Sequence, residues 1–232
     1  VLEKLNGYMD RKDQAAFYPV AFESGVYQGQ TYALPYESNP ILMCVNKDLL
    51  DKEGIAVPKE GWTLEEFYTI CKKLTKDTNG DGQLDQFGST EYTWKEALAA
   101  NGGHLFQGGM LKLTAPKVKE SLTFLQKLED LNKNYKVSSK DFDQGKVAFY
   151  PMTLAQYRTY KPYPYHVSKY SNFTWTCIPM PAKSKTTKAT LVTTTSFAMS
   201  ARSSHSKLAW KLMQLLTEDP DIQQTLFAQS QG

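Results

Sequence analysis

The spacing of hydrophobic residues along the chain predicts a series of amphipathic helices. Residues 63–74 predict the clearest helix, because Thr63 and Glu66 have the spacing of a capping box at its start. Residues 94–100 predict a short helix that ends at a pair of glycines, and residues 116–131 predict a longer helix that begins with a proline. The predicted apolar faces are Leu64, Phe67, Ile70, Cys71 and Leu74 in the first helix, and Val118, Leu122, Leu125, Leu128 and Leu131 in the last.

The two ends of the chain have different patterns. Residues 1–28 show little periodicity and predict mostly loop, whereas residues 206–216 predict an amphipathic helix and Asp219-Pro220 the start of another. The side chains expected to point inward in the two C-terminal helices are Leu208, Leu212, Leu215 and Leu216, then Ile222, Leu226 and Phe227. The apolar anchors expected near the N-terminus are Tyr8, Phe17, Tyr18 and Phe22.

Short apolar or β-branched runs predict strands at residues 31–34, 41–45, 146–150 and 190–201. Strands that alternate with helices indicate the α/β class. Between the first two strands lies the polar and aromatic segment Tyr36-Glu37-Ser38-Asn39. Hydrogen-bonding groups placed between buried strands favour a binding role, because burial without a partner is costly. The alternative is that the tyrosine packs in the core and the carboxylate is solvated.

Several further motifs follow this segment in a fixed order. Together they resemble the extracellular solute-binding proteins of ABC transporters, the maltose-binding-protein-like family, and the resemblance covers nearly the whole chain. No single motif is specific, and the order of all five carries the resemblance. The motifs are Gly61-Trp62-Thr63 with Leu64-Glu65-Glu66-Phe67, Asn101-Gly102-Gly103, Gly145-Lys146-Val147-Ala148-Phe149, Trp175 to Pro181, and Leu208-Ala209-Trp210-Lys211.

The resemblance implies a fold of the type II periplasmic-binding-protein kind, with two α/β lobes. Residues 1–38 and 193–232 would belong to the N-terminal lobe, and residues 39–192 would form the C-terminal lobe. The chain would cross between lobes near residues 36–40 and again near 191–196. The resemblance also implies that the chain is a fragment that lacks N- and C-terminal segments, so that the first lobe is incomplete.

The implied function is that of the substrate-binding component of an ABC importer. Such a protein captures a sugar or oligosaccharide between two lobes and delivers it to a membrane permease. A monomer outside the cytoplasm is expected, either periplasmic or a cell-surface lipoprotein, although this chain carries no signal peptide. The alternatives are a carbohydrate-active hydrolase and a sugar-sensing receptor that is not coupled to transport. Because the sequence lacks the usual catalytic motifs, we expect no enzymatic activity.

Ten residues are candidates for ligand contacts. Aromatic faces stack on sugar C–H groups, and carboxylates, amides and hydroxyls bind sugar hydroxyls. Trp94 could equally belong to the core, and Trp62 is expected to pack. Tyr160, Tyr163, Tyr165 and Tyr170 are weaker candidates. The candidates are Tyr36, Glu37, Ser38 and Asn39, then Tyr92, Trp94, Gly102 and Gly103, and finally Thr153 and Tyr157.

Residues 77–88 match the first part of an EF-hand calcium loop. Oxygen donors at alternate positions of a tight loop can converge on one hard cation. Gly88 stands where an EF-hand has its bidentate glutamate, so the match is partial. The alternative is a surface turn held by Asx hydrogen bonds. The predicted ligands of a structural Ca²⁺ are Asp77, Asn79, Asp81, Gln83 and Asp85.

Composition and charge limit the other functions. The 232 residues are 41% hydrophobic and carry a net charge of +3 without a basic block, which argues against nucleic acid as a partner. No apolar run approaches the roughly 20 residues that cross a bilayer. Cys44, Cys71 and Cys177 lie among apolar or helical neighbours at no metal-ligand spacing, so buried free thiols are expected.

Overall fold

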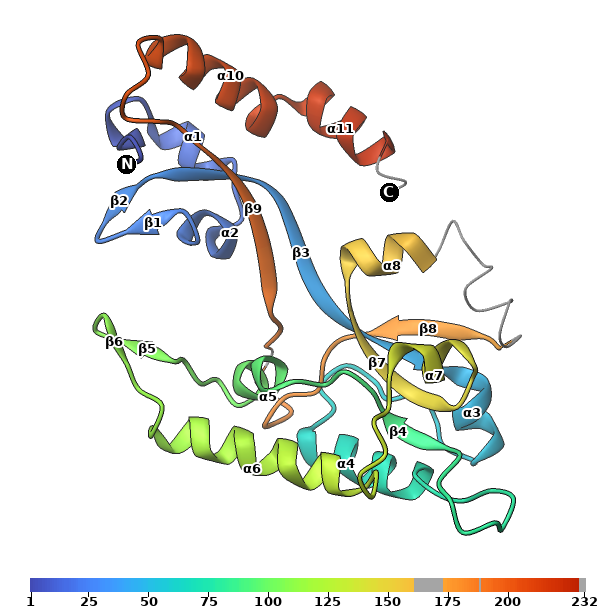
Figure 1. The fold of residues 1–232 in the computed structure, drawn as a ribbon. Coiled ribbons are helices and arrows are strands. Elements are labelled where there is room, and N and C mark those ends of the chain that lie inside the picture. Colours follow the sequence, from blue (N-terminus) through green and yellow to red (C-terminus); the bar gives the residue numbers. More distant parts are fainter. Residues whose placement is uncertain (161–172, 188, 230–232) are drawn as a thin grey trace. The chain divides into compact units, whose positions relative to one another are not determined.

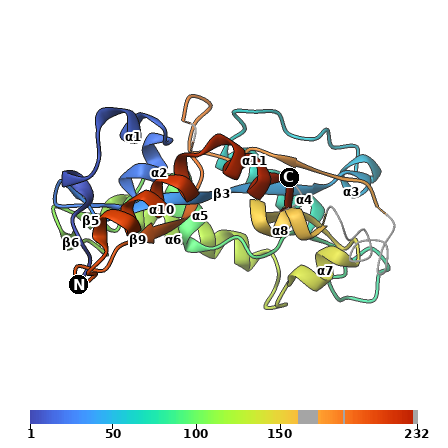
Figure 2. The ribbon, with the colours of Figure 1, turned by 90° about the horizontal axis from the view of Figure 1, so that it is seen from above.

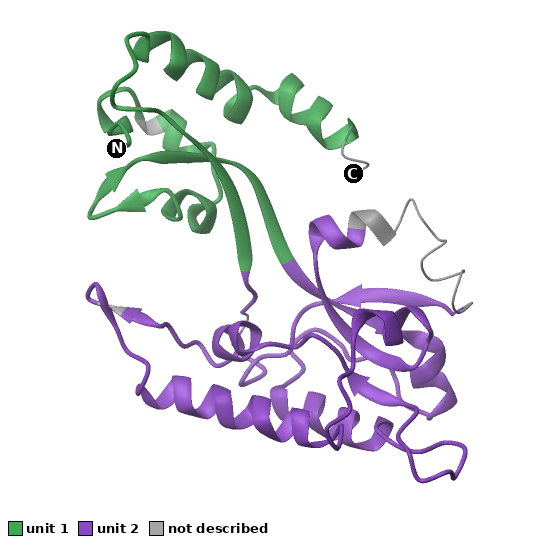
Figure 3. Cartoon of the chain, viewed as in Figure 1, with its two compact units in different colours: residues 1–40, 192–232 green, residues 41–191 purple. Residues whose placement is uncertain are grey.

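The computed structural model describes residues 1–160, 173–187 and 189–229. The chain divides into two compact units (Figure 3), which are described separately. Unit 1 consists of Val1–Pro40 and Val192–Gly232, and unit 2 of Ile41–Leu191. Two chain segments therefore connect the units.

Unit 1 is built around two long strands that pair with each other. Strand β3 extends from Ala33 to Asn46, and its N-terminal part, Ala33–Pro40, pairs antiparallel with β9, Val192–Ala198 (Figure 1). The other elements are η1 (Leu5–Gly7), α1 (Arg11–Ala15), α2 (Pro19–Glu23), β1 (Val26–Tyr27), β2 (Gln30–Thr31), α10 (Ser206–Glu218) and α11 (Pro220–Gln229).

Three expectations for residues 1–45 were wrong. The sequence predicts separate strands at 31–34 and 41–45, whereas β3 is continuous, because threonines of β9 pair with the polar segment and satisfy its backbone groups. Residues 1–28 contain three short helices rather than mostly loop. Tyr18 is 80% exposed and is no anchor, because it precedes Pro19 at the N-cap of α2 and its side chain points to solvent.

The predicted inward face of α10 was also wrong. Leu208, Leu212 and Leu215 are exposed, whereas Trp210 and Met213 are buried. The helix has two apolar stripes, and the one with Trp210 packs on the cluster formed by Leu5, Phe22, Leu34 and Met199. Helix α11 follows α10 directly (Figure 2), and its Leu226 and Phe227 are exposed, against the prediction.

Unit 2 contains a mixed sheet in the order β4-β7-β3-β8, with β4 parallel to β7 and the other pairs antiparallel. Its strands are β4 (Phe87–Ser89), β7 (Val147–Thr153), the C-terminal part of β3 and β8 (Trp175–Ile178), and a separate hairpin is formed by β5 (Phe106–Gln107) and β6 (Met110–Leu111). Its helices are α3 (Lys47–Lys52), α4 (Leu64–Leu74), α5 (Trp94–Ala100), α6 (Pro116–Asp130), α7 (Ser139–Asp143) and α8 (Leu154–Tyr160).

The main core of unit 2 lies between the sheet and helices α4, α5 and α6. Phe67 of α4 contacts Trp62, Tyr92 and Phe149, which confirms Trp62 as a packing residue. The capping box of Thr63 and Glu66 is present, as predicted, and α5 has the predicted limits. Leu122 is exposed, because α6 turns Ser121 instead toward α5, where the hydroxyl bonds Ala97 and Lys117 carbonyls.

Candidate functional site

In unit 2, hydrogen bonds at the end of strand β7 fix the positions of the predicted contact Thr153 and of its neighbour Gln156. Helix α8 follows β7 directly (Figure 1), and Thr153 lies at the junction. The Thr153 backbone N–H and hydroxyl donate to Gln156 Oε1 at 2.8 and 3.1 Å, and the Gln156 N–H donates to Thr153 Oγ1 at 3.1 Å. These reciprocal bonds form a capping box that fixes the first turn of α8. Thr153 therefore has a structural role, and ligand contact by this residue stays a prediction.

Polar groups near this turn include Tyr150 and Glu91. The Gln156 amide lies 3.4 Å from the Tyr150 hydroxyl, and the pKa of Tyr150 responds to the nearby Glu91 carboxylate. Burial is the main cause of a raised pKa for Tyr150, and the Glu91 carboxylate adds to it. Glu91 also accepts the Ser139 N–H at 3.2 Å and has a left-handed backbone with φ of 51°. Such strain is concentrated at functional sites.

Aromatic rings lie beside these polar groups, since Tyr150 and Trp175 belong to one apolar cluster. Tyr157 packs edge-on against Trp175 of β8, with ring centroids 5.7 Å apart, and both rings are half-buried. We call the connected group Glu91, Tyr150, Gln156, Tyr157 and Trp175 the polar–aromatic strip. Of this group, only Tyr157 is among the ligand contacts that the sequence predicts. The other four were missed because their contacts join residues 91, 150 and 175, which no local pattern connects.

The aromatic residues around α5 differ in exposure. Trp94 is 39% exposed at the first position of α5, so it is not a core residue. Tyr92 is buried against Phe67 and Phe124, and its hydroxyl has no hydrogen-bond partner. Both residues line a hollow of about 1050 Å³, together with Thr90, whose buried hydroxyl also lacks a partner. Unsatisfied hydroxyls on a hollow are groups that water or a ligand could satisfy.

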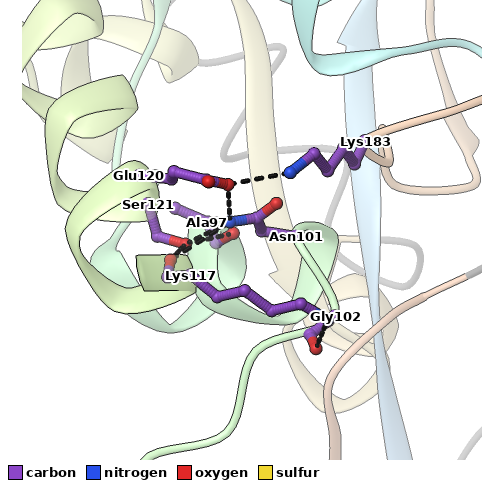
Figure 4. Close-up of polar contacts among 7 residues, drawn as sticks. All are labelled: Ala97, Asn101, Gly102, Lys117, Glu120, Ser121 and Lys183. Carbon is purple, nitrogen blue, oxygen red and sulfur yellow. Dashed lines mark hydrogen bonds and ion pairs between the residues drawn. The ribbon is translucent and has the colours of Figure 1, made fainter. Parts of the chain in front are cut away.

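The Asn101-Gly102-Gly103 turn has a clear structural role (Figure 4). The buried Asn101 amide donates to the Lys117 carbonyl and to Glu120 Oε2, both at 3.1 Å, and lies 3.4 Å from Ser121 Oγ. Lys183 approaches the same Glu120 oxygen at 2.8 Å, and Lys117 Nζ donates to the Gly102 carbonyl at 2.7 Å. These bonds fix the end of α5 on α6.

Backbone conformation at Gly102 and packing at Gly103 favour glycine in this turn. Gly102 has φ of 62°, a left-handed conformation that suits a residue without Cβ. A Cβ at Gly103 would lie 2.4 Å from Leu98 Cδ1. These requirements explain both glycines without a ligand, and their contact with a ligand stays a prediction.

The segment Tyr36–Asn39 lies in unit 1, where β3 pairs with β9. The pairing register shifts between Pro35 and Glu37, which makes Tyr36 the extra residue of a bulge, and its ring stacks on Phe197 at 4.6 Å. Glu37, Ser38 and Asn39 lie opposite Thr195, Thr194 and Thr193. Asn39 is buried, and its Oδ1 has no hydrogen-bond partner. The unsatisfied amide oxygen at this bulge is a free acceptor for a ligand hydroxyl. Ligand contact by Tyr36–Asn39 stays a prediction.

The loop predicted to bind calcium is ordered by its own hydrogen bonds. Asp77 accepts the backbone N–H groups of Gly80 and Gly82, each at 2.7 Å, and that of Asn79 at 3.1 Å. The hydrogen bond from the Gly82 backbone N–H is the main cause of the lowered pKa of Asp77. Asn79 Oδ1 accepts the Asp81 N–H, Asp81 accepts the Gln83 N–H, and both carboxylate oxygens of Asp85 accept from Thr78.

These contacts fit the alternative of a turn held by Asx bonds. In the described ranges, no group of three or more His, Cys, Asp and Glu side chains is arranged to hold a metal ion. Each carboxylate bond uses only some of the available lone pairs, so the loop retains oxygen donors. Calcium binding by Asp77, Asn79, Asp81, Gln83 and Asp85 stays a prediction.

The weaker tyrosine candidates Tyr163, Tyr165 and Tyr170 lie outside the described residues. Within the part of the chain that the structure describes, no helix is both long and apolar enough to cross a membrane.

The chain has the fold of a two-lobed solute-binding protein, with two α/β units joined by two segments. The chain belongs to the family of bacterial extracellular solute-binding proteins, whose sequence pattern matches residues 1–222. Family members are binding proteins. A binding protein of Brucella abortus (strain 2308) is 26% identical over 132 residues, which cover 56% of this chain and 32% of that protein.

Solved structures with a similar fold include three sugar complexes. An ABC substrate-binding protein from Listeria monocytogenes, in complex with cycloalternan, has a TM-score of 0.71 and 21% identity, covering 96% of this chain and 58% of that one. A cyclo/maltodextrin-binding protein complexed with maltotetraose has a TM-score of 0.73 and 21% identity, covering 98% and 58%.

The third sugar complex contains a monosaccharide ligand. A solute-binding protein from Thermotoga lettingae TMO, bound with α-D-tagatose, has a TM-score of 0.72 and 18% identity, covering 100% of this chain and 61% of that one. The chain thus spans about three fifths of the length of these structures and a third of the length of the Brucella protein.

Proposed function

We propose that this chain is part of the substrate-binding component of an ABC importer that takes up a sugar or oligosaccharide. It acts as a monomer outside the cytoplasm, in the periplasm or as a surface lipoprotein, and delivers its ligand to a membrane permease. The family match supports a binding protein, and the sugar complexes of similar structures support a carbohydrate ligand.

The polar–aromatic strip of unit 2 is the observation that carries the proposal. Tyr157 and Trp175 offer half-exposed ring faces, and the same strip holds a carboxylate and an amide in fixed positions. Sugars need both kinds of group, since rings pack on their C–H faces and polar side chains bond their hydroxyls. The rings are already positioned by their mutual packing, so little side-chain entropy is lost when a ligand binds.

A substitution at Tyr157 tests the role of the strip. Tyr157→Ala removes one ring, and loss of an aromatic contact of this kind costs on the order of 1–1.5 kcal/mol, close to a tenfold loss of affinity. Isothermal calorimetry with maltotetraose, cycloalternan and tagatose provides the measurement. Tyr18→Ala is the matched control, because Tyr18 is an exposed tyrosine of unit 1 outside the strip.

Two results would contradict this assignment. Unchanged affinity in Tyr157→Ala, for a sugar that the parent chain binds, would place the ligand elsewhere. An equal loss in Tyr18→Ala would show that the effect is not specific to the strip. Circular dichroism of both variants shows whether each is folded.

A further inference from the structure

The sheet of unit 2 places two cysteines directly opposite each other. Cys44 of β3 and Cys177 of β8 are register partners in the antiparallel pair. They are 133 positions apart in the sequence, and no local pattern indicates that they pair. In the structure both are free thiols, as is the buried Cys71.

The hydrogen bonds between β3 and β8 show whether Cys44 and Cys177 form a hydrogen-bonded or a non-hydrogen-bonded pair. The Lys47 N–H donates to the Thr174 carbonyl at 2.9 Å, and this pair continues the register of Asn46 with Trp175. Hydrogen-bonded and non-hydrogen-bonded pairs alternate along an antiparallel ladder. Cys44 lies three residues before Lys47, whose pair with Thr174 is hydrogen-bonded. Because the two types alternate, Cys44 and Cys177 form a non-hydrogen-bonded pair.

This position suits a covalent bond between the two side chains. Opposite residues in a non-hydrogen-bonded pair have Cα atoms about 4.5 Å apart and side chains closer than in the other type. Disulfides span Cα separations of roughly 4.4–6.8 Å. Both side chains also lie on one face of the sheet, beside the apolar cluster that contains Phe142 and Met152. The register therefore places the two cysteines at a type of position that a disulfide can span.

We propose that Cys44 and Cys177 form a redox-active pair that closes to a cross-strand disulfide between β3 and β8. The location of the family outside the cytoplasm provides an oxidising compartment in which such a bond persists. Strand β8 lies at the edge of the sheet, so the bond would tie the edge strand to an interior one. Trp175 lies two residues before Cys177, and the bond would also fix the strand that carries this ring.

The exposure of the two thiols assigns them different roles. The neighbouring Cys177, followed by burial, raises the pKa of Cys44, and the neighbouring Cys44 lowers the pKa of Cys177. Cys177 is half-buried, whereas Cys44 is fully buried. Cys177 is therefore the thiol that reacts first with an external reagent, because it is the more accessible of the two.

The oxidant is a disulfide, either a small molecule or a thiol oxidoreductase. The Cys177 thiolate attacks one sulfur of this disulfide and forms a mixed disulfide, with release of one thiolate. Cys44 then attacks the Cys177 sulfur, loses its proton to solvent and displaces the second thiolate. One S–S bond forms in the protein and one breaks in the oxidant, which gains the two electrons that the cysteines lose.

Oxidised glutathione provides the test on the full chain. The protein is reduced, incubated in a glutathione redox buffer, blocked with N-ethylmaleimide under denaturing conditions and weighed by mass spectrometry. We expect one blocked thiol, a mass loss of two hydrogens and a peptide that links Cys44 to Cys177. The oxidised protein should have a Tm roughly 5–15 °C above that of the reduced protein, because the bond closes a loop of more than 100 residues.

Three variants separate the proposal from its alternatives. Cys71→Ala should still form the bond, since Cys71 lies elsewhere in the core. Cys44→Ala should instead retain a glutathione adduct on Cys177, and Cys177→Ala should show neither bond nor adduct at Cys44. Three blocked thiols in the parent protein at redox equilibrium would overturn the proposal. So would a stable glutathione adduct on Cys177 while Cys44 is intact, or a disulfide between two molecules.

Discussion

The hydrogen bonds of Asn101 indicate that the Asn101-Gly102-Gly103 turn has a structural role. The substitution Asn101→Ala tests this role. The substitution removes an amide that donates to the Lys117 carbonyl and to Glu120 Oε2, both at 3.1 Å (Figure 4). A neutral hydrogen bond contributes about 1 kcal/mol and a bond to a charged group about 1.5–3 kcal/mol. Because about half of the Glu120 side chain is exposed, its bond belongs at the lower end of that range.

The expected loss of stability follows from these contacts. We expect Asn101→Ala to lower the free energy of unfolding by about 2–3 kcal/mol, since the bonds of Ser121 to Ala97 and Lys117 survive. For a chain of this size, that loss corresponds to a fall in Tm of roughly 4–12 °C. Thermal unfolding followed by circular dichroism measures the change. The folded protein should keep its affinity for sugar.

Lys183→Ala is the matched control for this experiment. It removes the ion pair to Glu120, whose two side chains are both about half exposed, and surface pairs contribute about 0–1 kcal/mol. Its Tm should therefore change by no more than about 4 °C. The reasoning is refuted if Asn101→Ala keeps the parent Tm but loses sugar binding, since the turn would then serve the ligand. Equal losses of stability in both variants would refute the expectation that the Asn101 hydrogen bonds contribute more than the Lys183–Glu120 ion pair.

Three further predictions concern unit 1 and the loop at Asp77. Glu37→Gln should weaken sugar binding about tenfold, as a charge-assisted bond contributes about 1.5–3 kcal/mol, and unchanged calorimetric affinity would exclude Glu37 as a contact. If the loop binds Ca²⁺, EDTA should lower the Tm and Ca²⁺ restore it, whereas Asp77→Ala should abolish this response; equal melting curves with EDTA and millimolar Ca²⁺ would leave only the turn. Burial, followed by the nearby Asp13 and Asp10, raises the pKa of Glu218 to about 7 from 4.5. The folded state therefore binds more protons between these values, so this carboxyl makes stability fall as pH rises from about 4.5 to 7. Glu218→Gln should flatten that fall in Tm, and an unchanged pH profile would contradict the assignment.

Local patterns predicted the elements whose causes are local. The capping box of Thr63 and Glu66 and the limits of α5 follow from residues within one helical turn, and both are present. The α/β class and the two-lobed fold were likewise predicted, because the order of motifs along the chain reflects the order of elements.

Features that depend on distant partners were not predicted. The sequence does not show that β9 lies against the polar part of β3, so it predicted two strands instead of one. Helix α10 has two apolar stripes, and only the packing of Trp210 on the N-terminal helices decides which one is buried. The polar–aromatic strip and the cysteine pair both depend on the register between strands, which no periodicity in the sequence specifies.

The proposed function is tested most directly by titrating the full chain with maltotetraose, cycloalternan and tagatose in a calorimeter, with chromatography of the sugars afterwards. The account predicts saturable binding of at least one of these sugars at one site per chain, with every sugar recovered intact. Saturable binding followed by shorter sugar products would show a hydrolase instead. The absence of binding to all three sugars by a folded chain would contradict the assignment of the polar–aromatic strip as a sugar site.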